Sequence, residues 1–257
     1  GFTAMCIDHP EVQALMGKIV DRRIISYGFS PQAEVRATKV SFNGGAAHFD
    51  VEISNRQDNS VINLNGITMP MPGRHNILNA LAAIAVSHEL GISDDVIRST
   101  FSKFSGVKRR FSLVDKVDGI TIVDDYAHHP VEISSVLSAA REAYQGRVIA
   151  VMQPHRYTRL QSLFKEFCAC FNHADTVIIA PVFEAGEDPI EGADQDALIE
   201  GLRNFGHKKV IKLEDPSALA AIISEQANSE DIVIFLGAGN ITNWAYDLPD
   251  ALRKARK

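Results

Sequence analysis

The second half of the chain alternates continuous apolar runs with segments whose apolar residues recur every three to four positions. The apolar runs predict strands at 120–124, 147–152, 176–181, 209–213 and 231–236. Helices are predicted to start near Pro130, Thr158, Asp194, Asp215 and Asn240. Strands that are apolar throughout are buried on both faces. The pattern therefore predicts a parallel sheet with helices on both sides.

The first half of the chain contains shorter runs in which apolar and polar residues alternate. A strand at 2–7 and a helix beginning near Pro10 come first. Alternating runs follow at 34–42, 48–53 and 60–64, separated by turn residues at 43–45 and 55–59. This pattern predicts an antiparallel meander. Two helices then follow at 76–90 and 94–104, and the first is apolar on nearly all sides, so we expect it to be buried.

Composition narrows the class of protein. The 257 residues are 46% apolar, which is typical of globular proteins, and the length allows two domains. A formal charge of −6 argues against broad nucleic-acid binding, which needs a basic surface. No apolar run reaches the roughly 20 residues of a membrane span. Three cysteines are too few for a disulfide framework, so we expect a cytoplasmic protein.

The densest polar cluster is Asp-Asp-Tyr-Ala-His-His-Pro at 124–130, directly after the strand 120–124. Ligand-binding residues gather at the carboxyl ends of parallel strands. Pro130 then begins a helix, whose N-terminal N–H groups suit an anion. The carboxylates of Asp124 and Asp125 can hold a ribose hydroxyl or a metal. The alternative is that one aspartate caps the helix while the histidines are solvated.

Two arginines follow the next strand, at Arg156 and Arg159 within Gln-Pro-His-Arg-Tyr-Thr-Arg at 153–159. Three positions apart, they lie on one face of the predicted helix. Guanidinium groups bind carboxylates and phosphates through two hydrogen bonds. Two cations at a helix N-terminus oppose the helix dipole, which favours an anionic ligand. The alternative is ion pairing with neighbouring surface acids.

His75, Asn76 and Asn79 lie close together at the start of the helix predicted at 76–90. The two asparagines share one face, where their amides can pair with the edge of an adenine. His75 can stack or hydrogen-bond nearby. The alternative for Asn76 is plain helix capping.

Three further segments give weaker indications. Lys-Arg-Arg at 108–110 lies at the junction of the two halves and is interpreted either as a triphosphate contact or as a solvated basic linker. The acidic loop at 183–192 is by default solvated. Gly-Ala-Gly at 237–239 permits close backbone approach, but it lacks the third glycine of the dinucleotide fingerprint.

Taken in order, these motifs resemble the Mur ligase family. They are Gly-Arg-His-Asn at 73–76, Arg-Arg-Phe at 109–111, and the segments at 124–130, 153–159 and 237–241. The resemblance covers nearly the whole chain. The motifs at 124–130 and 153–159 together are similar to those of the members that join L-alanine to UDP-N-acetylmuramic acid. The alternatives are a murein-peptide recycling ligase, which is similar in the first of these two motifs, and a non-catalytic nucleotide-binding module.

The resemblance implies an α/β fold with two domains. Residues 1–107 would form the latter part of a central ATP-binding domain with an antiparallel meander. Residues 108–257 would form a C-terminal Rossmann-like domain with a parallel sheet that binds the amino acid. The phosphate-loop pattern Gly-x-x-x-x-Gly-Lys-[Ser/Thr] does not occur in this sequence. We therefore expect that loop, a UDP-binding domain and the main magnesium ligands to precede Gly1.

The resemblance also implies roles for single residues in binding ATP. His75, Asn76 and Asn79 would surround the adenine, Arg110 would reach the terminal phosphates, and Asp125 would bind the ribose. The cofactors would be ATP and Mg²⁺. As a fragment, the chain is expected to be inactive alone, and its first half is expected to be weakly ordered or to self-associate.

The amino-acid site implied by the resemblance lies in the second half. Arg156 and Arg159 would hold the carboxylate of L-alanine, and Tyr126, His128 and His155 would line the site. His128 would orient or deprotonate the amine, because imidazole titrates near neutral pH. UDP-N-acetylmuramic acid would be the other substrate. Neither nucleic acid nor a membrane is expected as a partner.

Overall fold

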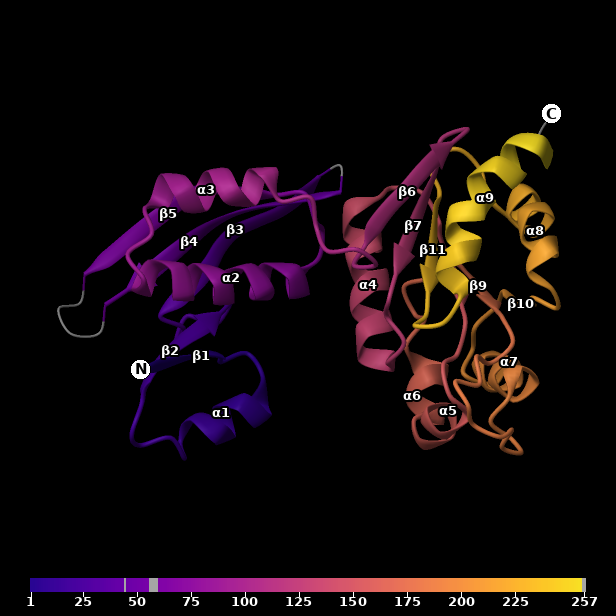
Figure 1. The fold of residues 1–257 in the computed structure, drawn as a ribbon, viewed down its shortest axis with the longest axis horizontal. Helices are drawn as coiled ribbons and strands as arrows, with labels where there is room; N and C mark the ends of the chain where they lie inside the picture. Colours follow the sequence, from indigo (N-terminus) through magenta and orange to yellow (C-terminus); the bar gives the residue numbers. More distant parts are fainter. Residues whose placement is uncertain (44, 56–59, 256–257) are drawn as a thin grey trace. The chain divides into compact units, whose positions relative to one another are not determined.

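The structure, a computed structural model, describes residues 1–43, 45–55 and 60–255. The chain divides into two compact units, residues 1–105 and residues 106–257, each built around one sheet (Figure 1). The predicted boundary lay between residues 107 and 108. The turn residues 44 and 56–59, which separate the predicted strands of the first half, lie outside the described residues.

The first unit contains a five-stranded sheet in the order β1-β2-β3-β4-β5. The strands are β1 (Phe2–Cys6), β2 (Arg23–Gly28), β3 (Val35–Asn43), β4 (Ala46–Ser54) and β5 (Val61–Met69). Strands β1, β2 and β3 are parallel, whereas β3, β4 and β5 pair antiparallel. The predicted meander is confirmed, and β2 is a strand that the sequence pattern did not predict.

Helices cover one face of this sheet. They are α2 (Arg74–Glu89) and α3 (Asp94–Lys103), while α1 (Pro10–Met16) follows β1. Alternation in β4 places Phe49 and Val51 in the same core as Leu81 of α2. The expectation that α2 is buried on nearly all sides is wrong. It buries one face, while Val86 is 38% exposed, because the sheet offers it a single surface within this unit.

The second unit contains a six-stranded sheet in the order β10-β9-β8-β11-β7-β6. The strands are β6 (Ser112–Val117), β7 (Ile120–Asp125), β8 (Val148–Met152), β9 (Thr176–Ile179), β10 (Val210–Lys212) and β11 (Ile232–Leu236). The five predicted strands are β7 to β11, and they pair in parallel with one another, as predicted. The unpredicted strand β6 pairs antiparallel with β7. Asp118 and Gly119 join the two with positive φ angles of 49° and 84°, as in a tight hairpin turn.

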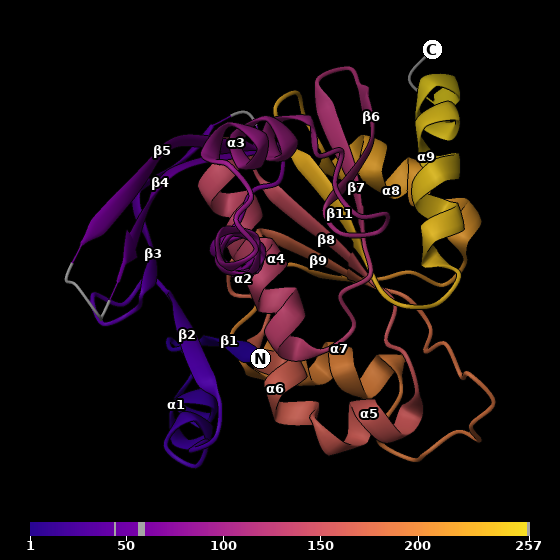
Figure 2. The ribbon, with the colours of Figure 1, turned by 60° about the vertical axis from the view of Figure 1, so that its left-hand side comes forward.

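Helices cover both faces of the second sheet, as predicted (Figure 2). One face carries α4 (Pro130–Ala143), α5 (Tyr157–Ser162), α6 (Phe164–Ala169) and α7 (Gln195–Asn204). The other face carries α8 (Leu219–Gln226), preceded by a short 3-10 turn (Pro216–Ala218), and α9 (Ile241–Ala255). Within the described ranges, no helix is long and apolar enough to cross a membrane.

Candidate active site

Strand β7 ends in two buried aspartates with different partners. The carboxylate of Asp125 is 2% exposed and accepts hydrogen bonds from the N–H groups of Phe111 and Ala127, both at 2.7 Å. Burial raises the pKa of Asp125 to about 6. Asp125 therefore fastens the chain entering β6 to the turn that leads into α4. Neither aspartate caps α4, because His129 occupies that position.

Asp124 belongs to a network that begins in the junction between the two halves of the chain. Its Oδ2 accepts a hydrogen bond from Thr242 Oγ1 at 2.6 Å and lies 3.7 Å from Arg109 Nε. Burial raises the pKa of this carboxyl group. Arg109 also donates to the carbonyl of Gly237, and its guanidinium lies 4.8 Å from the centre of the Tyr126 ring. Arg109 is thus held inside the second unit.

Arg110, the next residue, is exposed and makes a different contact. Its Nη1 lies 3.4 Å from Glu132 Oε1. The other oxygen of Glu132 accepts from the backbone N–H groups of His128 and His129, each at 3.3 Å. Glu132 is the third residue of α4 and forms a capping box with His129. Our interpretation of the sequence missed Glu132, although its spacing from His129 is that of a capping box.

The two imidazoles of the candidate site contact partners that distinguish their ring nitrogens. Nδ1 of His128 lies 2.9 Å from the carbonyl oxygen of Tyr126, so it carries the proton and leaves Nε2 as the acceptor. Nδ1 of His155 lies 3.3 Å from Nη1 of Arg159, a donor, so the proton of the neutral ring is on Nε2. Burial, followed by the charge of Arg159, lowers the pKa of His155. The ring centres of the two histidines are 6.0 Å apart.

The two predicted arginines differ in their surroundings. Arg159 is half-buried, and its Nη1 also donates to the carbonyl of His155 at 3.0 Å. Arg156 is half-exposed and lies 3.6 Å from Glu187 of the acidic loop. Glu187 also accepts from Thr158 through both oxygens, so this part of the acidic loop is bound to α5 rather than fully solvated. Helix α5 is only six residues long, so its dipole is small.

Backbone strain is concentrated around these side chains. Arg109, Phe111, Arg156 and Ala185 have φ angles of 59°, 50°, 75° and 52°, in the left-handed region that side chains other than glycine seldom adopt. Such conformations persist where the surrounding contacts hold them, often at functional sites. The hydrogen bonds of Asp125 and Arg109 supply such contacts at the entry to β6.

The glycine turn after β11 packs against the end of β8. A Cβ on Gly239 would lie 2.5 Å from Gln153 Oε1 and 2.7 Å from the ring of Phe183. Gln153 in turn donates to Asn240 Oδ1 at 2.9 Å. The close approach that the Gly-x-Gly pattern predicts is therefore made here by the protein's own side chains.

The predicted adenine contacts lie at the start of α2 in the first unit. Asn79 is exposed, whereas Asn76 is buried and donates through Nδ2 to the carbonyl of Pro72 at 2.8 Å. Asn76 does not cap the helix, because Gly73 holds that position. Beside them, the guanidinium of Arg74 lies 3.9 Å from the centre of the Phe29 ring.

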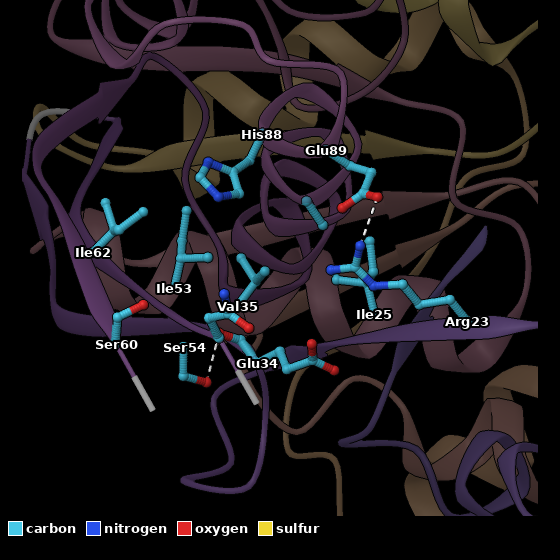
Figure 3. Close-up of a pocket in the computed structure, with 12 residues that line it drawn as sticks. Arg23, Ile25, Glu34, Val35, Ile53, Ser54, Ser60, Ile62, His88 and Glu89 are labelled. Atoms are coloured by element: carbon cyan, nitrogen blue, oxygen red, sulfur yellow. Dashed lines mark hydrogen bonds and ion pairs between the residues drawn. The ribbon is translucent and has the colours of Figure 1, made fainter. Parts of the chain in front are cut away.

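The first unit also contains a cavity of about 200 Å³ at the other end of α2 (Figure 3). Its lining includes apolar residues such as Ile25 and Val35 together with His88, and an ion pair of 2.7 Å between Arg23 and Glu89 lies at its side. None of the predicted site residues lines it. In the part of the chain that the structure describes, no group of three or more His, Cys, Asp or Glu residues is placed to hold a metal.

Comparison with known proteins extends these observations. The family model for the Mur ligase glutamate ligase domain matches residues 109–239, and that for the Mur ligase middle domain matches residues 2–87. The chain belongs to the Mur ligase family. The UDP-N-acetylmuramate–L-alanine ligase of Nitrobacter winogradskyi is 57% identical over 253 residues, which are 98% of this chain and 54% of that protein. The chain thus spans about half the length of the curated relatives it matches.

Solved Mur ligase structures share the fold. The UDP-N-acetylmuramate-alanine ligase of Thermotoga maritima is 24% identical with a TM-score of 0.72, covering 90% of this chain and 48% of that one. The MurF ligase of the same organism, in complex with ADP, is 18% identical with a TM-score of 0.74, covering 100% of this chain and 55% of that one. At these identities the likeness extends to the fold alone, which agrees with the predicted fold class.

Proposed function

We propose that this chain is the nucleotide- and amine-binding portion of an ATP-dependent ligase that joins L-alanine to UDP-N-acetylmuramic acid. The observation that carries the proposal is the cluster of His128, His155, Arg156 and Arg159 at the carboxyl ends of β7 and β8. Within that cluster Arg159 is half-buried beside a histidine whose pKa is lowered. The named relatives at 57% identity support the same substrates.

The proposed reaction makes an amide in two steps. The muramate carboxylate attacks the γ-phosphoryl group of ATP, which gives an acyl phosphate and ADP. The amine of L-alanine then attacks the acyl carbon, the bond from carbon to the phosphate oxygen breaks, and phosphate leaves. The first step needs positioning and charge neutralisation. The second needs an amine that has lost a proton.

The two histidines suit different tasks in the second step. Nε2 of His128 is the acceptor nitrogen of its ring, so we assign it the proton of the alanine ammonium group. Nε2–H of His155 is a donor and lies on the same ring that contacts Arg159, so we assign both of these groups to the alanine carboxylate. Tyr126, whose ring meets that of His128 edge-on at 5.0 Å, lines the same site.

The proposed nucleotide contacts come from both units. His75, Asn76 and Asn79 would meet the adenine, with Asn79 exposed for that contact. Arg110 would reach the terminal phosphates by exchanging Glu132 for them.

Asp125 is a poorer match to its proposed role at the ribose. Its two carboxylate oxygens each already accept a backbone hydrogen bond, so a ribose hydroxyl would use a remaining lone pair. For Mg²⁺ we assign no ligand, because no suitable cluster forms among the described residues.

The test is L-alanine-dependent phosphate release from ATP and UDP-N-acetylmuramic acid. We would compare this chain with a longer protein that has the full length of its relatives. Activity of the longer protein alone is the expected result. Activity with a tripeptide but not with L-alanine would replace the proposal with a recycling ligase. No phosphate release with either amine would favour a binding module.

In the longer protein, Arg159→Ala should raise the KM for L-alanine far more than the KM for ATP. Arg203→Ala is a control, because Arg203 lies on α7 and donates to the carbonyl of Val210. Equal rises in the two KM values would contradict the role of Arg159.

A further inference from the structure

Of the two arginines of the candidate site, Arg156 lies beside a carboxylate and Arg159 does not, within the described residues. Glu187 lies 3.6 Å from Arg156 Nη1. Arg159 instead contacts the ring and carbonyl of His155, and across the described ranges no carboxylate lies within ion-pair distance of it. The pair therefore carries two positive charges against one negative charge.

Glu187 is held in place by the fold. Residues 184–187 form a tight turn in which Glu187 N–H donates to the carbonyl of Glu184 at 3.1 Å. Ala185 and Gly186 occupy the centre of that turn with φ angles of 52° and 82°. The Glu187 carboxylate then accepts from Thr158 N–H at 3.0 Å and from Thr158 Oγ1 at 2.7 Å. Its side chain is 18% exposed, so it is a fixed anion and not a solvated one.

The base of the same loop is also fixed to the site. Phe183 N–H donates to the carbonyl of Pro154 at 2.8 Å, and Arg156 N–H donates to the carbonyl of Phe183 at 2.9 Å. The Phe183 ring stacks on His155 at 5.3 Å between centres. The loop therefore holds Glu187 in a fixed position beside Arg156.

We propose that Glu187 is a specificity-determining residue: it occupies the carboxylate position beside Arg156, so the site accepts an amino acid with one carboxylate and rejects one with two. This rests on the proposed function, since it takes the arginines to bind the amino acid. A small neutral side chain then meets no unfavourable charge.

The physical basis is the balance of charges. One substrate carboxylate beside Arg159 completes the neutralisation of the two guanidinium groups. A second carboxylate would have to lie beside Arg156, where Glu187 already is, and like charges a few ångströms apart repel. Discrimination of this kind arises when a group of the protein repels the wrong substrate.

The first test uses binding alone. The 257-residue chain is titrated with propionate, a monoanion, and with succinate, a dianion, while the backbone amide signals of Thr158 and His155 are followed by NMR. In Glu187→Gln, the affinity for succinate relative to propionate should rise roughly tenfold over the natural chain, about 1.4 kcal/mol. The same ratio in both proteins would overturn the proposal.

Glu184→Gln is the matched control, because Glu184 is an exposed carboxylate of the same turn. It should leave the ratio of succinate to propionate affinity unchanged. A rise as large as that in Glu187→Gln would mean that general loop charge, and not the fixed contact, sets the preference, and this would also overturn the proposal.

The second test uses turnover by the longer protein supplied with equal concentrations of L-alanine and L-aspartate. The ratio of aspartate product to alanine product should rise roughly tenfold in Glu187→Gln. If Glu187 only stabilised the loop, both products would fall together and the ratio would stay constant. A natural protein that makes no alanine product contradicts the proposed function instead, and the anion titration still decides the role of Glu187.

Discussion

The two units bury their sheets in different ways. In the first unit the helices α2 and α3 cover one face, and β4 alternates buried and partly exposed residues along its length. In the second unit every residue of β7, β8, β9 and β11 is buried, because helices lie on both faces. The polar residues that remain buried in the second sheet must therefore find partners within the protein, whereas those on the open face of the first can use water.

The largest expected effect separates the cores of the two units. Phe235 of β11 and Phe49 of β4 are 0% and 2% exposed and fill different cores. Each Phe→Ala change should destabilise its own unit by about 3–5 kcal/mol. Urea unfolding followed by fluorescence of Trp244, the single tryptophan, reports on the second unit, and hydrogen exchange of β4 reports on the first.

The expectation that each change destabilises only its own unit is contradicted if the two units unfold in one transition. In that case Phe49→Ala would move the Trp244 transition as far as Phe235→Ala does. Val86→Ala is a useful control in the first unit, because Val86 is 38% exposed on α2 and the change should cost little.

The second prediction concerns pH. The folded pKa of Asp125, about 6, lies above its ordinary value of 3.8, so its contribution to stability is present below about pH 4 and is lost as pH rises through 6. The free energy of unfolding of the natural chain relative to Asp125→Asn should therefore fall by about 3 kcal/mol between pH 4 and 7. Urea titrations followed by Trp244 measure this difference.

A difference between the two proteins that stays constant across this pH range would contradict the buried-carboxylate account. In the first unit, Asp50 should give the opposite pH dependence of stability. A hydrogen bond from Lys39 lowers the pKa of Asp50, which lies on the open face of the sheet. Stability from Asp50 is therefore lost as pH falls.

The sequence predicted the second unit better than the first, and the two missed strands show why. Strand β2 carries Ser26, fully buried, whose hydroxyl accepts from Glu34 N–H at 3.0 Å. A buried polar residue interrupts the apolar pattern that predicts strands. Strand β6 is an edge strand in which Leu113 is 67% exposed, so its pattern is irregular, although Asp118-Gly119 was a usable hairpin signal.

Only those parts of the candidate site that directly follow predicted strands could be predicted from the sequence. The motifs after β7 and β8 were expected to meet, and the structure brings His128 and His155 together. The resemblance gave a role to Arg110 and none to Arg109, whose guanidinium donates to the carbonyl of Gly237, 128 positions away. Glu187 was missed because its partner, Thr158, is 29 positions away.

The third prediction uses a buried ion pair of the second unit. Asp231 is 4% exposed and accepts from Arg147 Nη2 at 2.7 Å and from the N–H groups of Arg147 and Asn228 at 2.8 Å. Asp231→Ala leaves these donors without a partner and should cost about 2–4 kcal/mol. Calorimetric melting would measure it. A cost no larger than that of Asp196→Ala, an exposed partner of Lys212, would contradict the account.

The smallest expected effect lies on the open face of the first sheet. Glu52 and Arg36 are 3.5 Å apart with side chains 42% and 35% exposed. Glu52→Gln should change the free energy of unfolding of the first unit by less than about 1 kcal/mol, and less still in high salt, because water screens the pair. Hydrogen exchange at two salt concentrations measures this. A salt-independent loss of several kcal/mol would mean that this face is covered.

Because Gly239 has no side chain, the loops around it can pack closely, and this packing restricts which loops can be exchanged. The loop after β11 fits against Gln153 from the end of β8 and Phe183 from the loop after β9, with no room for even a methyl group. These three loops therefore form one closely packed unit. A graft that exchanges a single loop for that of a distant relative should misfit, whereas exchanging all three together should preserve their packing.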